Sequence, residues 1–164
     1  MAKNPLIITI GREYGSGGLV HAVGMSTHYQ AGFFAPHHLP LSETIFISQA
    51  QVIRDIAAKE RAVIVGRCAD YILAGRKNTV NIFIHAPKED RVRRIMALHG
   101  LSEADALKEI ARSDKERGNH YFRYTDLKWG KAQNYDLCVN SSLLGIEGTV
   151  EMLMDVAKIE ERTL

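Results

Sequence analysis

Four short runs of mostly β-branched, apolar residues constrain the fold of this chain more than any other feature. The runs are nearly continuous rather than alternating, which is typical of strands covered on both faces. Strands of this kind belong to parallel sheets, whose neighbouring strands are joined by helical crossovers. The four expected strands span residues 6–10, 62–65, 80–84 and 135–139.

Helical signals lie between and after these runs. Pro87 suits the first position of a helix, and Ser102 with Asp105 resembles a capping box that opens the next one. Gly100 fits the break between those two helices. Because strands alternate with helices, we expect an α/β fold of three layers, with a parallel sheet flanked by helices. The expected helices lie over residues 46–57, 88–98, 103–117 and 146–157.

Composition and charge exclude several classes of protein. The 164 residues have an ordinary globular composition, so we expect one domain over residues 1–164. A net charge of +2, with both signs interspersed, gives no broad field for nucleic acid or a membrane surface. No apolar run is long enough for a membrane span, and no signal peptide is evident. We therefore expect a cytoplasmic protein that binds no nucleic acid or membrane.

Residues 19–41 show neither a helical nor a strand period. An irregular connection of that length is uncommon inside a compact domain. One hypothesis is that this segment flanks a stretch omitted after Gly18, so that residues distant in the natural protein are joined here. An intact mass well above 18.3 kDa would support the hypothesis, whereas a matching mass would exclude it.

A glycine-rich segment follows the first expected strand directly, from Gly11 to Gly18. At that place a turn of glycines lets backbone N–H groups converge on a phosphate, since glycine permits positive φ and close approach of an anion. The segment departs from the P-loop pattern GxxxxGK[ST], because its spacing differs and it lacks the lysine. Arg12 is the candidate to supply that charge. A turn without a ligand is the alternative interpretation.

Several segments, in their order along the chain, resemble the cytidylate kinase-like family, a branch of the P-loop nucleoside monophosphate kinases. Residues 8–18 and 63–71 are similar to that family's glycine-rich loop and to the turn near its acceptor. Residues 82–94 resemble the strand and basic helix before its lid, and residues 135–142 resemble its last strand and the loop near adenine. After Gly18 the chain departs from the family, whose next helix and strand are not evident here.

The resemblance implies a three-layer P-loop kinase-like fold with a helical lid at about residues 112–131. It also implies transfer of a phosphoryl group from ATP, with Mg²⁺, to a small nucleotide such as CMP. The acceptor is expected beside Arg67 and Asp70, and adenine beside Asn140 and Ser141. The residues expected to hold the donor phosphates are Gly11, Gly15, Ser16, Gly17 and Gly18.

Phosphoryl transfer needs positive charge around the moving group and little covalent chemistry from the protein. The expected catalytic residues are therefore arginines. Arg12 lies in the glycine-rich segment, and Arg112, Arg117 and Arg123 lie in the expected lid, which in the resembled kinases closes over the phosphoryl group and excludes water. Gly118 is a candidate hinge between a helix and an aromatic, basic loop. A charged surface helix is the alternative interpretation of this segment.

Two further arginines, Arg91 and Arg94, share one face of the expected helix over 88–98. Their spacing leaves two interpretations open, a phosphate-binding role and a solvated basic face. Cys68 and Cys138 are far apart, with no second Cys or His at metal spacing, so we assign no metal site to the protein.

Two other functions stay open on the sequence. The first is a non-catalytic module that binds a nucleotide or anion on a kinase fold, which the missing lysine favours. The second is a kinase that acts on a non-nucleotide small molecule. Only a panel of acceptors separates the second from a nucleoside monophosphate kinase.

Overall fold

A computed structural model describes residues 5–17, 32–34 and 43–163. Within this part of the chain, five strands form one parallel sheet in the order β2-β3-β1-β4-β5. All four expected strands are confirmed within two residues at either end. The fifth, β2, lies inside the segment 19–41, whose other residues fall outside the described part. The strands are β1 (Ile7–Arg12), β2 (Gly32–Phe34), β3 (Ala62–Val65), β4 (Thr79–His85) and β5 (Leu137–Asn140).

The helices confirm most of the local signals. Ser102 caps a helix by accepting the backbone N–H of Asp105 at 3.2 Å, and Gly100 ends the preceding helix in the left-handed region. The last helix contains a kink at Gly145, which has a φ of 70°. The helices are α2 (Glu43–Lys59), α3 (Ala69–Ile72), α4 (Lys88–His99), α5 (Glu103–Thr125), the 3₁₀ turn η1 (Ala132–Asn134) and α6 (Ser141–Thr163).

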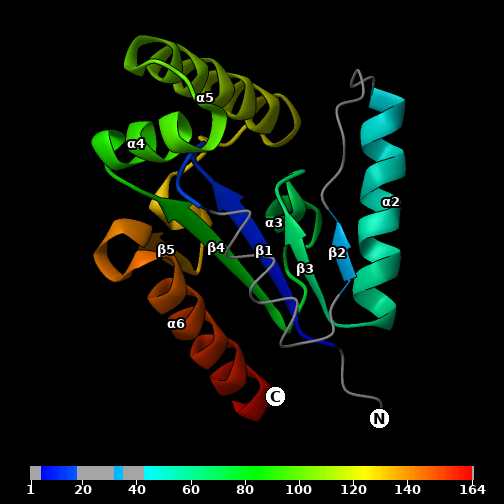
Figure 1. The fold of residues 1–164 in the computed structure, drawn as a ribbon. Helices are drawn as coiled ribbons and strands as arrows, with labels where there is room; N and C mark the ends of the chain where they lie inside the picture. Colours follow the sequence, from blue (N-terminus) through cyan, green and yellow to red (C-terminus); the bar gives the residue numbers. More distant parts are fainter. Residues whose placement is uncertain (1–4, 18–31, 35–42, 164) are drawn as a thin grey trace.

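The sheet is the middle of three layers (Figure 1). On one face, Ile8 and Ile10 of β1 pack in a core with Leu153 of α6. On the other face, Ile7 packs with residues of α2 and α3, including Ile53. Strands β1 and β3 are therefore covered on both sides, which is why their sequences are mostly apolar. None of the helices in the described residues combines the length and apolarity that crossing a membrane requires.

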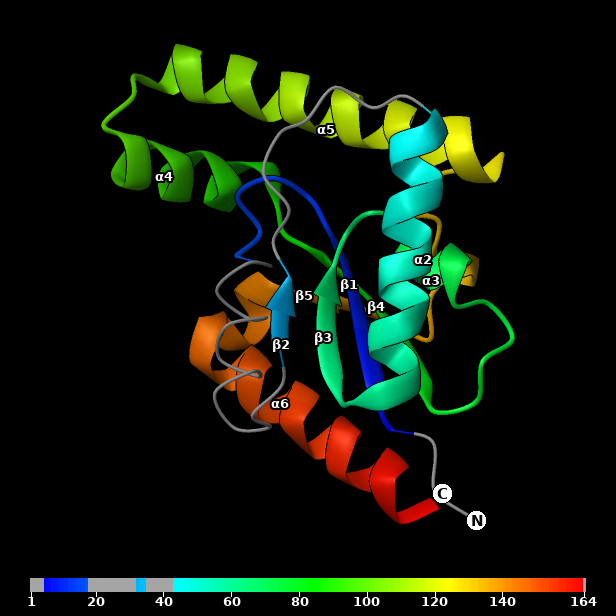
Figure 2. The same ribbon diagram turned by 90° about the vertical axis from the view of Figure 1, so that its right-hand side faces the viewer.

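Helices α4 and α5 form an antiparallel hairpin that lies across the carboxyl edge of the sheet (Figure 2). The hairpin has its own small core, in which Val92 and Ile95 of α4 meet Ala106 and Ile110 of α5. The hairpin covers the edge where the first strand runs into the glycine-rich segment.

The expectation of a loop after Gly118 is wrong. Helix α5 continues through Gly118 to Thr125, although a glycine inside a helix costs about 1 kcal/mol relative to alanine. Tyr121 and Thr125 are buried at 5% and 7% exposure, so packing of this last part of the helix outweighs the local preference.

A nearly buried ion-pair network holds the glycine-rich segment against the hairpin. The Arg91 guanidinium lies between the carboxylates of Glu13 and Asp114, and its Nε donates to the carbonyl of Tyr14 at 2.7 Å. Asp114 also accepts the backbone N–H of Tyr14, at 2.8 Å. Because Arg91 is only 6% exposed, water screens these contacts poorly.

A second arginine braces the same segment from the other side. Arg94 donates to the carbonyl of Gly15 at 3.4 Å and to the hydroxyl of Ser141 at 3.1 Å. The Ser141 hydroxyl in turn donates to the carbonyl of Ser16 at 2.7 Å. Arg91 and Arg94 thus share a face as expected, but they bind protein groups of the loop, so the structure supports neither a solvated basic face nor a phosphate site for them.

Replacing Arg91 tests this bracing. We expect Arg91→Met to lower the free energy of unfolding by about 3 kcal/mol, because it removes the guanidinium that pairs with the carboxylates of both Glu13 and Asp114. Urea denaturation measures the change. The matched control is Arg93→Met on the same helix, since the Arg93 side chain is 76% exposed and its pair with Asp90 is a surface contact. Equal stability of the two variants would contradict the account.

Candidate functional site

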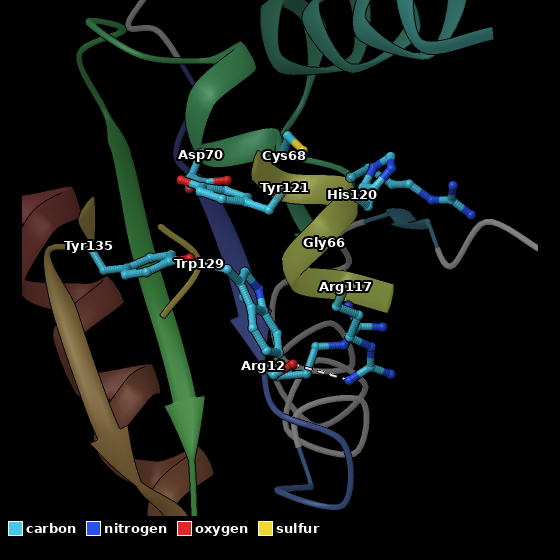
Figure 3. Close-up of a pocket in the computed structure, with 11 residues that line it drawn as sticks. Arg12, Gly66, Cys68, Asp70, Arg117, His120, Tyr121, Trp129 and Tyr135 are labelled. Atoms are coloured by element: carbon cyan, nitrogen blue, oxygen red, sulfur yellow. Dashed lines mark hydrogen bonds between the residues drawn. The ribbon is translucent and has the colours of Figure 1, made fainter. Parts of the chain in front are cut away.

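A hollow of about 380 Å³, counted with the open solvent at its mouth, lies where β1 and β3 end beneath α5 (Figure 3). Ligands of open α/β sheets bind at this carboxyl edge, near the strand from which the connections diverge to both sides. Five residues that the sequence analysis expected at the site line the hollow: Gly11, Arg12, Arg67, Asp70 and Arg117.

Arg12 is a half-buried cation that lies beside other cations. Among the described residues, no carboxylate pairs with its guanidinium, and Arg117 and Arg67 are its charged neighbours. Burial, and next the charges of Arg117 and Arg67, lower the pKa of Arg12 from 12.5 to about 9. Like charges that are shielded from water repel strongly, so an anion in the hollow would relieve this repulsion.

Arg117 holds the helix against the end of the first strand. Its guanidinium donates to the Arg12 carbonyl at 3.1 Å and lies 5.2 Å from the centre of the Tyr14 ring (Figure 3). Burial lowers the pKa of Arg117, while nearby Asp114 and Tyr14 oppose that change. The two arginine side chains therefore form one cationic end of the hollow.

The turn after β3 is strained. Gly66, Arg67 and Cys68 have φ values of 69°, 58° and 54°, all in the left-handed region. For the two residues with side chains this conformation costs about 1 kcal/mol each. A Cβ at Gly66 would lie 2.7 Å from Nη1 of Arg12, so a side chain there would displace the Arg12 guanidinium. Strain of this kind persists mainly at functional sites, and here it carries Arg67 and Asp70 into the hollow.

A hydrogen-bonded acid lies at the opposite end of the hollow from Arg12 (Figure 3). The Tyr121 hydroxyl donates to Oδ2 of Asp70 at 2.6 Å. Burial raises the pKa of Asp70, whereas the hydrogen bond from Tyr121 lowers it. Burial also raises the pKa of the neighbouring Cys68 thiol, to about 12, so Cys68 is protonated and is not a nucleophile.

Flat aromatic side chains complete the wall. Tyr135 and Trp129 line the hollow, and both contact the ring of Phe83, at centroid distances of 4.9 and 5.4 Å. The site therefore combines a cationic end, an acidic end and an aromatic side, which suits a small anionic molecule with a flat polar group.

The glycine-rich segment adopts a turn with φ values of 78° at Gly15 and 82° at Gly17. The backbone N–H groups of Glu13, Tyr14 and Ser16 donate to protein acceptors at 2.8–3.3 Å. These three N–H groups are therefore engaged within the protein. The position of Gly18 lies outside the described residues.

The structure does not bring every expected residue into the hollow. Arg112 is exposed and pairs with Glu116 at 3.5 Å, and Arg123 is exposed with its guanidinium 5.9 Å from the Tyr124 ring centre. Both lie on α5, but a continuous helix turns them away from the face that carries Arg117.

Near the end of β5, Ser141 is fully buried and holds the glycine-rich segment, as described above. Its side chain therefore has a supporting position rather than an exposed one facing a base. The neighbouring Asn140 is half-buried, and its side-chain oxygen accepts the backbone N–H of Ser142 at 3.0 Å.

Sequence reasoning missed Gly66, Tyr121, Trp129 and Tyr135. One signal could have found Tyr121, because it follows Arg117 by four residues and so shares its face if the helix continues. Trp129 and Tyr135 lie in an irregular segment, and no local pattern points them to the hollow. No group of His, Cys, Asp and Glu within the described ranges could hold a metal ion.

The fold is shared with solved structures of small-molecule kinases. A gluconokinase from Sinorhizobium meliloti has the same fold, with a TM-score of 0.60, 13% identity and coverage of 98% of both chains. The APS kinase CysC of Mycobacterium tuberculosis, with a TM-score of 0.56 and 14% identity, matches 94% of this chain and 98% of its own. At such identities the likeness shows the fold alone.

The chain belongs to the cytidylate kinase-like family, whose model matches residues 25–143. An uncharacterized protein from Eubacterium ventriosum has a solved structure that is 32% identical, with a TM-score of 0.87 and coverage of 93% of this chain and 98% of that one.

Two curated relatives match shorter stretches. A cytidylate kinase of Ignicoccus hospitalis is 31% identical over 74 residues, which is 45% of this chain and 43% of that protein. A uronate isomerase of Corynebacterium glutamicum is 32% identical over 107 residues, which is 64% of this chain and 21% of that protein. The chain thus spans less than half the length of either relative.

Inorganic phosphate tests the cationic end of the hollow. We expect phosphate at a hundredfold excess over its Kd to stabilise the protein by about 2.7 kcal/mol, a rise in Tm of roughly 5–10 °C. In Arg12→Met this rise should be lost. Without phosphate the variant should melt above the natural protein, since it lacks a half-buried cation that its neighbours repel.

Differential scanning fluorimetry measures these shifts, with Arg93→Met as the control for removal of a surface arginine. A full phosphate shift in Arg12→Met would show that the anion binds elsewhere.

Proposed function

We propose that this chain is a kinase that transfers the γ-phosphoryl group of ATP to a small acceptor, with a nucleoside monophosphate such as CMP the first candidate. One observation carries the proposal: the half-buried Arg12 guanidinium, which no described carboxylate neutralises, lies beside Arg117 and Arg67 at the carboxyl edge of a P-loop kinase fold. Concentrated positive charge, shielded from water, is what phosphoryl transfer requires of a protein.

The arginines that line the hollow carry positive charge, which complements the negative charge of the ATP phosphates. Kinases of this class use ATP with Mg²⁺, which together supply the phosphoryl group and neutralise part of its charge. In our proposal Arg12 supplies the positive charge that a lysine supplies in other P-loop proteins. The turn at Gly15 and Gly17 lies on the same segment, next to Arg12.

The acceptor is proposed to lie between Arg67 and Asp70. Both line the hollow, and the strained turn that carries them would be costly to keep without a use. Trp129 and Tyr135 add aromatic surface suited to a flat base. The name of the Ignicoccus hospitalis relative, cytidylate kinase, supports CMP as the first acceptor to try.

Helix α5 is proposed to act as the cover of the site. It carries Arg117 onto the Arg12 carbonyl, and closure of this kind would exclude water that would otherwise take the phosphoryl group. The proposal assigns no role to Arg112 or Arg123, because both are exposed in the structure.

A non-catalytic nucleotide- or anion-binding module is the second candidate. Two observations favour it: the segment lacks the lysine, and the N–H groups of Glu13, Tyr14 and Ser16 already donate to protein acceptors. Under this reading, ATP or phosphate binds but no acceptor increases the formation of ADP.

Release of ADP from ATP and Mg²⁺, measured across CMP, UMP, AMP, GMP and sugar acceptors, separates these functions. We expect a clear rate above the ATP-only background with at least one pyrimidine nucleotide. If only a sugar increases the release of ADP, the acceptor is a non-nucleotide molecule. If calorimetry shows that ATP binds but no acceptor increases the release of ADP, the protein is a non-catalytic binding module.

Arg67→Ala tests the acceptor site within the same assay. We expect its kcat/KM for the acceptor to fall at least tenfold, which corresponds to about 1.4 kcal/mol of lost transition-state stabilisation. Arg93→Ala, an exposed arginine outside the hollow, is the control. Unchanged kinetics in Arg67→Ala would remove that residue from the mechanism.

A further inference from the structure

We propose that Tyr121 is a positioning residue for the acceptor, because its hydroxyl donates to the Asp70 carboxylate and fixes the orientation in which that carboxylate can receive a hydrogen-bond donor of the acceptor. The inference rests on the proposed function, in which Asp70 contacts the acceptor. It adds a residue of the covering helix to the acceptor site.

The geometry of the pair supports this role. Tyr121 is 5% exposed, and its ring reaches from α5 to the start of α3 (Figure 3). The 2.6 Å distance from its hydroxyl to Oδ2 of Asp70 is that of a charge-assisted O–H···O⁻ hydrogen bond. A phenol that donates to a carboxylate stabilises the ionised form, and it fixes the plane in which the other oxygen lies.

Asp70 needs such a partner. Burial disfavours its charged form, and no nearby positive charge is among the influences that lower its pKa. The contacts that favour ionisation are the Tyr121 hydroxyl and the backbone N–H groups of Asp70 and Tyr71. Of these three contacts, the hydrogen bond from Tyr121 lowers the pKa of Asp70 the most.

The other titratable groups around Asp70 do not replace Tyr121. Cys68 precedes it on the strained turn with a protonated thiol, and Tyr135 faces it from the segment before β5. Burial raises the pKa of the Tyr135 hydroxyl, so that group is neutral as well. Arg67 lies near Cys68 on the same turn. An ionised carboxylate has about four acceptor positions, which leaves capacity for a ligand beside these contacts.

One helix face thereby serves both ends of the hollow. Arg117 and Tyr121 are four residues apart on α5, so they point the same way. Arg117 contacts the Arg12 end, whereas Tyr121 contacts Asp70. When α5 is docked, the cationic end and the acidic end are held in fixed relation to each other.

Titration of the Asp70 carboxyl group by ¹³C NMR tests the pair without any ligand. Removing a hydrogen bond to the charged form raises the pKa of an acid. We therefore expect Asp70 to titrate at a higher pH in Tyr121→Phe than in the natural protein, and at an unchanged pH in Tyr71→Phe, an exposed control next to Asp70. The same titration in all three proteins would overturn the inference.

Binding of CMP, measured by calorimetry from pH 5 to pH 8 without ATP, tests the consequence for the acceptor. We expect Tyr121→Phe to bind CMP about tenfold more weakly, the effect of losing about 1.4 kcal/mol. Its affinity should also begin to fall at a higher pH as the solution is acidified, since Asp70 is protonated sooner.

A double variant separates positioning from a merely structural effect. If Tyr121 acts through Asp70, Tyr121→Phe should weaken CMP binding far less when Asp70→Asn is already present. Equal losses in both backgrounds would overturn the inference.

The two proposals fail in different ways. If the natural protein binds CMP and Tyr121→Phe binds it equally well at every pH, the inference on Tyr121 falls while the proposed function stands. If the natural protein binds none of the nucleoside monophosphates but still releases ADP with another acceptor, the nucleotide acceptor and the inference on Tyr121 fall while the kinase function stands.

Discussion

The docking of one face of α5 on the carboxyl edge of the sheet positions every other part of the candidate site. Asp114 accepts the Tyr14 backbone N–H, Arg117 donates to the Arg12 carbonyl, and Tyr121 donates to Asp70. These contacts join the glycine-rich segment, the end of β1 and the turn after β3 to a single helix. A change in the position of α5 would therefore alter both ends of the hollow at once, which is the behaviour required of a cover.

Several features of the site destabilise the folded state when no ligand is bound. Arg12 is a half-buried cation among other cations, and Arg67 and Cys68 hold left-handed backbone conformations. Such features persist where the surrounding structure is strong enough to hold them and a ligand uses them. The continuous core of the sheet and the Arg91 network supply that support here. The unfavourable features are gathered at the hollow, and this distribution is the physical argument for function there.

Local chemistry predicted much of the fold. Continuous apolar runs specified the buried strands, and Ser102 and Gly100 marked helix ends, because each signal depends on neighbours in the sequence. The extension of α5 past Gly118 could not be predicted this way, since burial of Tyr121 under the helix decides it. The roles of Arg91 and Arg94 were also out of reach. Arg91 pairs with Glu13 and Asp114, which are distant in sequence, and spacing on a helix does not reveal such partners.

Of the candidate site, Arg12, Arg67, Asp70 and Arg117 were expected from the sequence and meet in one hollow. The measurement that tests the account most directly is a crystal structure of the protein with CMP. The account predicts the CMP phosphate within hydrogen-bonding distance of Arg12, Arg67 or Arg117, with the base toward Asp70. CMP bound away from this hollow, or no CMP bound at saturating concentration, would contradict it.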